Sequence, residues 1–392
     1  MTRKRPVRAT TTAIACVLFF LPALAYVVGS RAGNDLNRAA TQWSDVRAGW
    51  TMFADFGAFI GDRVPLRSTA VDADGWIDRR LFHENPAFGG SALPRVIEGE
   101  DGHLFLHEDV EMACRHADRT REAITNLRSV VDLVAASGRR VYVSVSPNKT
   151  TIDDALLPDD TAGRGCLTSY TTNLKSAISD LLPNDQYVDL YTALSGDGDS
   201  EPRYYRMDSH WTAHGALLAV RAFVESASPG TWDDSAIVDS GPIEYAGDLT
   251  LLQGDVRNDS AEWFDVRREG IPEPTVDVRD GGDLTHIDRT YASTGPAGAL
   301  ADTRLLVVTD SFGVKAFQYV VPWFTSVTFF HFDNANPELL AERIADADVV
   351  WFLSVERSVV PRFETTSTRP DYFLGNPAFL TTLSDALGLG SE

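Results

Sequence analysis

The sequence predicts an α/β fold in which helices flank a parallel β-sheet. The first observation is a set of short, continuously apolar stretches, which is typical of strands buried on both faces. The second is that amphipathic helical patterns separate these stretches and indicate one domain. The expected strands are 139–146, 186–191, 303–309, 326–332 and 348–355, and the expected helices are 119–137, 168–182, 212–226, 313–321 and 337–346.

Three other segments flank or interrupt this alternation. Residues 30–94 are predicted to form a mostly helical approach to the main domain, which spans 95–392. At the start of that domain, "RVIEGEDGHLFL" (95–106) alternates around Asp101-Gly102, which suits a β-hairpin. Residues 229–303 are rich in Asp, Gly, Pro and Ser and show little periodicity, so an irregular insertion is expected there.

The N-terminus predicts export. "MTRKRPVR" is basic, and the following residues 13–29 carry no charge. A basic flank before an apolar run describes either a cleaved signal peptide or an anchor with its N-terminus inside the cell. Residues 1–29 are therefore expected to direct the rest of the chain out of the cytoplasm. The protein would be a single-pass cell-membrane protein, or secreted if the segment is cleaved.

The net charge argues against one class of partner, and the cysteine positions agree with export. Lys and Arg number 35 against 56 Asp and Glu, a net charge of −21, which argues against nucleic-acid binding. Cys16 lies in the apolar segment, so Cys114 and Cys166 are the two thiols of the exported part. In an oxidising compartment they predict one disulfide, and two separate buried thiols are the alternative.

Candidate catalytic residues lie in two stretches that are far apart in the sequence. "RLLVVTDSFG" (304–313) places Ser311 between an expected strand and an expected helix, where a nucleophilic hydroxyl can lie beside helix N-terminal amides. "MDSHWTAHGA" (207–216) places Asp208 and His210 just before another helix, where they could serve as orienting group and base. The simpler alternative for Ser311 is that it or Asp310 only caps the helix.

A metal site is the other alternative for "HWTAH". His210 and His214 have the spacing of a zinc-protease helix. However, Trp211 occupies the position where that motif needs its general-base glutamate, and no third ligand follows by spacing. No metal or other cofactor is therefore expected.

Several blocks together resemble the alginate O-acetyltransferase AlgX/AlgJ-like family, whose domain is SGNH-hydrolase-like with a permuted order, the Asp/His block preceding the serine block. "DSHWTAHGA" is similar to the family's Asp-x-His-Trp block and "VVTDSFG" to its serine block. The similarity spans roughly residues 50–360, and the blocks occur in order. Secondary blocks are "GEDGHLFL" (99–106), "VSVSPNKTTIDDALLP" (143–158), "YAGDL" (245–249) and "VERS" (355–358).

The resemblance implies a catalytic triad of Asp208, His210 and Ser311. The backbone amides of Ser311 and Gly313 would hold the oxyanion. Further oxyanion or substrate-binding candidates are Asn148, which is equally well a turn residue, Lys149 in the Pro-x-Lys block and Arg357 in the Glu-Arg block. His214 falls where the family has no fixed catalytic residue.

The resemblance also implies an activity and its partners. The expected function is O-acetyl transfer to hydroxyls of a cell-surface or secreted polysaccharide through an acyl-serine intermediate. A membrane-bound O-acyltransferase partner would supply the acetyl groups. The alternatives are an acetylesterase with the same triad, which passes the acyl group to water, and a non-catalytic polysaccharide-binding component of an export assembly.

Overall fold

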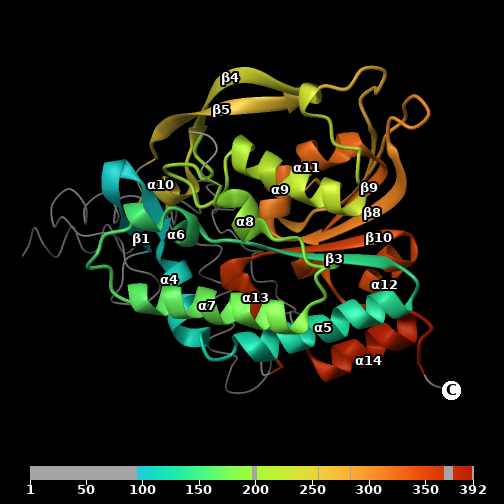
Figure 1. Ribbon diagram of the computed structural model, residues 1–392, viewed down its shortest axis with the longest axis horizontal. Helices are drawn as coiled ribbons and strands as arrows, with labels where there is room; N and C mark the ends of the chain where they lie inside the picture. Colours follow the sequence, from blue (N-terminus) through green and yellow to red (C-terminus); the bar gives the residue numbers. More distant parts are fainter. Residues whose placement is uncertain (1–94, 197–200, 255, 283, 366–373, 391–392) are drawn as a thin grey trace, which may run out of the picture. The chain divides into compact units, whose positions relative to one another are not determined.

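The computed structural model describes residues 95–196, 201–254, 256–282, 284–365 and 374–390 (Figure 1). The chain divides into two compact units, one of residues 1–86 with 253–255 and one of residues 87–252 with 256–392. The expected signal segment (1–29) and helical approach segment (30–94) lie outside the described residues. Within the described residues, no helix combines the length and the apolar character that crossing a bilayer requires.

The second unit is built on a six-stranded sheet with the strand order β3-β10-β8-β9-β7-β6. The first four of these strands are parallel, and the last two add an antiparallel edge. The predicted α/β fold is confirmed, with a sheet that is mostly rather than wholly parallel. The strands are β3 (Arg140–Ser146), β10 (Val349–Val355), β8 (Ala301–Thr309), β9 (Phe324–His331), β7 (Asp288–Ala292) and β6 (Thr275–Val278).

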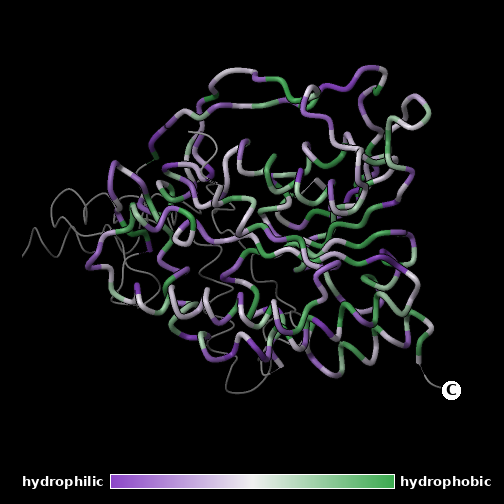
Figure 2. The backbone as a smooth tube through the Cα atoms, viewed as in Figure 1, coloured by the Kyte–Doolittle hydropathy of each residue, from purple (hydrophilic) through white to green (hydrophobic). Residues whose placement is uncertain are grey.

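Helices cover both faces of this sheet (Figure 1). Side chains of β10 alternate between two hydrophobic clusters: Val350 and Phe352 join one, and Trp351 and Leu353 join the other. Both faces are therefore apolar, and Figure 2 shows the central strands as hydrophobic. One cluster contains α5 (Thr120–Ala136), α7 (Arg164–Leu181), α12 (Pro337–Ala345), α13 (Val359–Phe363) and α14 (Pro377–Ala386), and the other contains α8 (Leu190–Leu194), α9 (Ala213–Ala227) and α11 (Ser311–Val320).

The prediction of a strand at 186–191 is wrong. Only Tyr187 pairs with the sheet, through a single parallel bridge to Val143. Asp189 then accepts a hydrogen bond from the Thr192 N–H and starts α8. An aspartate cap inside an apolar run ends the extended conformation, because it satisfies the first free amides of a helix.

The prediction of an irregular insertion at 229–303 is also wrong. This stretch contains an antiparallel hairpin of β4 (Ile237–Ala246) and β5 (Asn258–Val266), as well as α10 (Asp248–Leu252), β6 and β7. Partly buried and exposed positions alternate along β4, and all four positions of β6 are exposed. Strands with so little burial lack the continuous apolar run by which the other strands were recognised.

The N-terminal hairpin and the disulfide are confirmed. β1 (Val96–Glu98) pairs antiparallel with β2 (Leu104–Leu106), and Asp101 takes a left-handed φ of 52° in the turn between them. Cys114, in α4 (His107–His116), is bonded to Cys166 in α7, with Cα atoms 4.8 Å apart. The bond joins two helices that are 52 residues apart in sequence.

Candidate active site

Ser311 is the first residue of α11 and follows directly from the end of β8. Asp310 caps this helix: its carboxylate accepts hydrogen bonds from the N–H groups of Phe312 (3.1 Å) and Val355 (2.8 Å). The cap and the candidate nucleophile are thus two different residues. Because the Asp310 side chain supplies the cap, the Ser311 hydroxyl is left to interact outside the helix.

Gly313 allows α11 to start close to the sheet. A Cβ atom at this position would lie 2.2 Å from Oγ1 of Thr309, the last residue of β8. The Thr309 hydroxyl in turn donates to the Leu353 carbonyl at 3.1 Å, so it has little room to move. The absence of a side chain at Gly313 therefore lets the turn fold tightly over the strand end.

Asp208, His210 and Ser311 form one hydrogen-bonded chain. The His210 Nε2 lies 2.9 Å from the Ser311 Oγ, and the His210 Nδ1 lies 2.7 Å from Asp208 Oδ1. A carboxylate can only accept, so Nδ1 carries the imidazole proton and Nε2 is left to accept from the serine hydroxyl. The fold brings together His210 and Ser311, which are 101 positions apart in the sequence.

The surroundings of Asp208 keep its carboxyl group ionised. Burial opposes ionisation, but hydrogen bonds from the His210 ring and backbone and from the Asp248 N–H, together with the charge of His210, hold the pKa of Asp208 well below its ordinary value. Oδ1 accepts from the His210 N–H at 2.9 Å, and Oδ2 accepts from the Asp248 N–H at 3.1 Å. An ionised Asp208 is the form that orients a catalytic histidine.

Backbone pairing joins the two ends of the loop that carries Asp208 and His210, and a buried lysine binds carbonyl groups within the loop. An antiparallel bridge joins Tyr204 to Trp211, which is 1% exposed. Within the loop, the Lys149 Nζ donates to the carbonyl groups of Tyr205 (2.6 Å) and Arg206 (2.8 Å). Lys149 also donates to the Leu104 carbonyl of β2, at 2.8 Å.

Lys149 thus lies beneath the loop, and its side chain is 1% exposed. Burial lowers the pKa of its ammonium group to about 8, which is the cost of removing this charge from water. The sequence suggested Lys149 as an oxyanion or substrate contact. The structure places its ammonium group on backbone carbonyls of β2 and of the loop that carries Asp208 and His210, so Lys149 holds that loop in place.

Asn148 and Arg357 lie at the same edge of the sheet as Ser311. Asn148 follows β3 and Arg357 follows β10, which is the strand between β3 and β8. The Arg357 N–H donates to Asn148 Oδ1 at 3.2 Å, and this bond fixes the orientation of the side-chain amide. The Asn148 N–H donates to Oε2 of the buried Glu356 at 2.9 Å.

The Arg357 guanidinium group packs beside the nucleophile turn. Its central carbon lies 5.7 Å from the centre of the Phe312 ring, next to Ser311. Its Nη1 lies 3.3 Å from Asp109 Oδ1, on α4. Burial raises the pKa of the Asp109 carboxyl to about 6, although the charge of Arg357 opposes this shift. No sequence pattern had indicated Asp109.

The sequence had not singled out Asp248 as a site residue, although its Oδ2 lies 3.5 Å from the His210 Nδ1. Asp208, His210 and Asp248 bring three possible metal-ligand atoms within 4.8 Å of one another. Hydrogen bonds from the protein already engage the oxygens of both carboxylates. His214 is outside this group and packs near Phe264, with ring centres 6.1 Å apart. The signal that could have found Asp248 is its place in "YAGDL".

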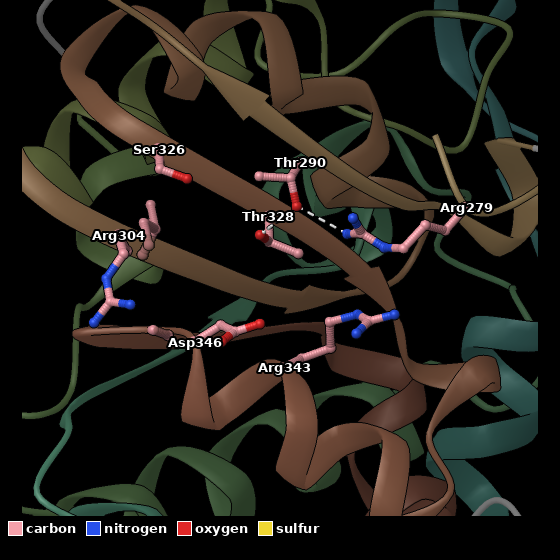
Figure 3. Close-up of a pocket in the computed structure, with 9 residues that line it drawn as sticks. Arg279, Thr290, Arg304, Ser326, Thr328, Arg343 and Asp346 are labelled. Atoms are coloured by element: carbon pink, nitrogen blue, oxygen red, sulfur yellow. Dashed lines mark hydrogen bonds between the residues drawn. The ribbon is translucent and has the colours of Figure 1, made fainter. Parts of the chain in front are cut away.

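A separate cavity of about 230 Å³ is lined by residues near the starts of β8 and β9, among them Arg304 and Ser326 (Figure 3). Three arginines line it, but each is paired. Asp288 binds Arg279 and Arg343, at 3.0 Å and 2.9 Å, and Asp348 binds Arg304 at 2.7 Å. Asp277 and Glu342 are further partners of Arg279 and Arg343. Because these charges are matched by carboxylates of the described residues, the three arginines do not form an unpaired cluster of positive charge in the cavity.

Residues 96–267 match the family model described as SGNH hydrolase-like domain, acetyltransferase AlgX. The match includes Asp208 and His210 and ends before Ser311. It confirms, for these residues, the resemblance to the AlgX/AlgJ-like family. No curated protein matches the chain.

Solved structures similar to this chain include three bacterial proteins. The O-acetyltransferase domain of Pseudomonas putida AlgJ is 15% identical, with a TM-score of 0.47, covering 75% of this chain and 100% of that chain. Bacillus cereus PatB1 with a sulfonyl adduct is 12% identical, with a TM-score of 0.48, covering 67% and 95%. Pseudomonas aeruginosa AlgX is 12% identical, with a TM-score of 0.45, covering 74% and 65%.

Proposed function

We propose that this chain is an extracytoplasmic O-acetyltransferase that transfers acetyl groups to hydroxyls of a polysaccharide. The observation that carries the proposal is the hydrogen-bonded chain from Asp208 through His210 to Ser311, at the carboxyl edge of a mostly parallel sheet. The family match over residues 96–267 supports acetyl transfer as the chemistry.

The proposed reaction has two halves. In the first, the His210 Nε2 takes the Ser311 proton while Oγ attacks the acetyl carbonyl of the donor, and the donor leaves with that proton. In the second, a sugar hydroxyl gives its proton to His210 and attacks the acetyl-serine, which regenerates Ser311. The Ser311 and Gly313 amides and the Asn148 side chain would stabilise the oxyanion in both halves.

We further propose where the protein works and with what. Residues 1–29 would anchor the chain in the cell membrane or direct its secretion, so that the catalytic domain meets its acceptor outside the cytoplasm. A membrane-bound O-acyltransferase partner would deliver the acetyl groups, because acetyl donors are made inside the cell. An acetylesterase would use the same triad but pass the acetyl group to water.

The test is to incubate the exported domain with a chromogenic acetyl ester and soluble oligosaccharides, and to measure acetylated sugar and free acetate. Ser311→Ala and His210→Ala should each abolish both products, because triad members act as a unit. His214→Ala is the matched histidine control and should keep most of the activity. A folded His210→Ala protein with full activity would refute the triad, and free acetate without acetylated sugar would favour the esterase.

A further inference from the structure

Asp248 holds the residue that lies between two members of the triad. Ser209 donates its backbone N–H to Asp248 Oδ1 at 2.7 Å and its hydroxyl to Asp248 Oδ2 at 2.6 Å. In return, the Asp248 N–H donates to Asp208 Oδ2 at 3.1 Å. The loop that carries Asp208 and His210 is therefore tied to the start of α10 at two successive residues, Asp208 and Ser209.

The Asp248 carboxylate also adds a second negative charge beside the catalytic imidazole. Its Oδ2 lies 3.5 Å from the His210 Nδ1, which is longer than a good hydrogen bond but well within strong electrostatic reach. Asp208, at 2.7 Å, takes the hydrogen bond itself. When His210 accepts the Ser311 proton, the resulting imidazolium faces two carboxylates rather than one.

The other charged groups near Asp208, His210 and Asp248 lie beneath the loop or across the Phe312 ring from His210. The Lys149 Nζ is 3.5 Å from the Asp208 backbone carbonyl, beneath the loop. Arg357 lies over Phe312, whose ring also packs on His210 with centres 5.1 Å apart. Asp310 caps α11 through the Phe312 N–H. Within the described residues, Asp208 and Asp248 are thus the two carboxylates that lie within ion-pair distance of His210.

Holding this second carboxylate costs electrostatic energy. Burial and the neighbouring Asp208 charge both raise the pKa of Asp248 above its ordinary value. The two hydrogen bonds from Ser209 offset part of that cost. A neutral side chain could tie down Ser209 without the repulsion, so the charge itself points to a role at His210.

We propose that Asp248 is a positioning residue of the triad, whose carboxylate orients the Asp208–His210 loop through Ser209 and stabilises the protonated imidazole of His210 during acyl transfer. The proposal rests on the proposed function only through the triad. It predicts two separable effects of losing Asp248, one on the rate and one on the pH at which the base becomes active.

The experiment measures the rate at which phenylmethylsulfonyl fluoride labels Ser311, followed by intact mass from about pH 5 to pH 9. This reaction needs the activated serine but no acetyl donor or sugar. The plot of labelling rate against pH should have an acid limb, where the rate rises with pH, and a plateau above it. Asp248→Asn should lower the plateau rate about tenfold. It should also move the acid limb about one pH unit lower, since removal of a nearby negative charge makes the imidazole accept a proton less readily.

Three further variants separate charge from structure. Ser209→Ala keeps the charge and removes one hydrogen bond, so it should lower the plateau without moving the limb. Asp248→Glu should restore the wild-type limb in part. Asp265→Asn removes an exposed carboxylate of the same hairpin and should change neither quantity.

An Asp248→Asn protein that melts like the wild type and keeps its acid limb would overturn the electrostatic role, whatever its plateau. An unchanged plateau as well would overturn the positioning role. Failure of the proposed function gives a different result: Ser311 would be labelled normally, with the Asp248 effects intact, while no acetyl group reached any sugar.

Discussion

Gly247→Ala tests whether the two loops of the active site must touch through their backbones. A Cβ atom at Gly247 would lie 1.9 Å from the Met207 carbonyl oxygen and 2.5 Å from its carbonyl carbon. These are backbone atoms, so no side-chain rotation can relieve the clash. Met207 directly precedes Asp208, and Gly247 directly precedes Asp248.

The size of the effect follows from these distances. The contact has to lengthen to at least 3.0 Å, so the loops must separate by about 1 Å. The hydrogen bond from the Asp248 N–H to Asp208, now 3.1 Å long, would then break. We expect a loss of about 1–3 kcal/mol in unfolding free energy from overpacking, and a loss of activity on the order of 100-fold from the displaced His210.

The assay pairs a urea denaturation curve with the rate of chromogenic ester turnover. Gly165→Ala is the matched control, because a Cβ there meets nothing within 4 Å and the residue lies in helix α7. That substitution should leave activity unchanged and stability equal or slightly higher. A folded Gly247→Ala protein within twofold of wild-type activity would refute the claim that this close approach sets the triad.

Two further predictions concern stability. Replacing Cys114 and Cys166 by alanine should lower the unfolding free energy by about 4 kcal/mol, given the separation of 52 residues. Reduction of the wild-type disulfide should produce the same loss in urea denaturation. Equal stability of the oxidised wild type and the double variant would contradict this prediction. The lowered pKa of Asp208 means that its carboxylate stabilises the fold above the unfolded pKa of about 3.9, and that this contribution is lost as pH falls toward the folded value. Between pH 5 and pH 3, Asp208→Asn should therefore lose about 1 kcal/mol less stability than the wild type, and parallel curves would count against the shift.

Local patterns in the sequence were enough to predict most of the regular elements and to select Asp208, His210 and Ser311, which the fold joins in one hydrogen-bonded chain. The strands β3, β8, β9 and β10 are buried on both faces, so each appears as a continuous apolar run. Asp208 and His210 occupy one short motif, and Ser311 lies where an apolar strand meets a helix. Cys114 and Cys166 could be paired because the only other cysteine lies in the N-terminal apolar segment.

Elements with weak burial could not be predicted in this way. The hairpin β4–β5 and the edge strand β6 are partly or wholly exposed, so their side chains carry no clear apolar period. Conversely, the apolar run at 186–191 suggested a strand, whereas Asp189 caps a helix there. Exposure and capping depend on what packs against a segment, and the segment's own composition does not contain that information.

Only the tertiary structure showed how the triad is supported. Asp248 reaches His210 from the start of α10, some 40 residues later in the chain, and this proximity depends on the path of α9 and β4 between them. Lys149 binds carbonyl groups of the loop, and Gly247 abuts the Met207 carbonyl. Backbone atoms are the same at every residue, so contacts made through them leave no mark on the identity of the partner. The sequence therefore selected the candidate catalytic residues, and the fold determined which residues hold them in place.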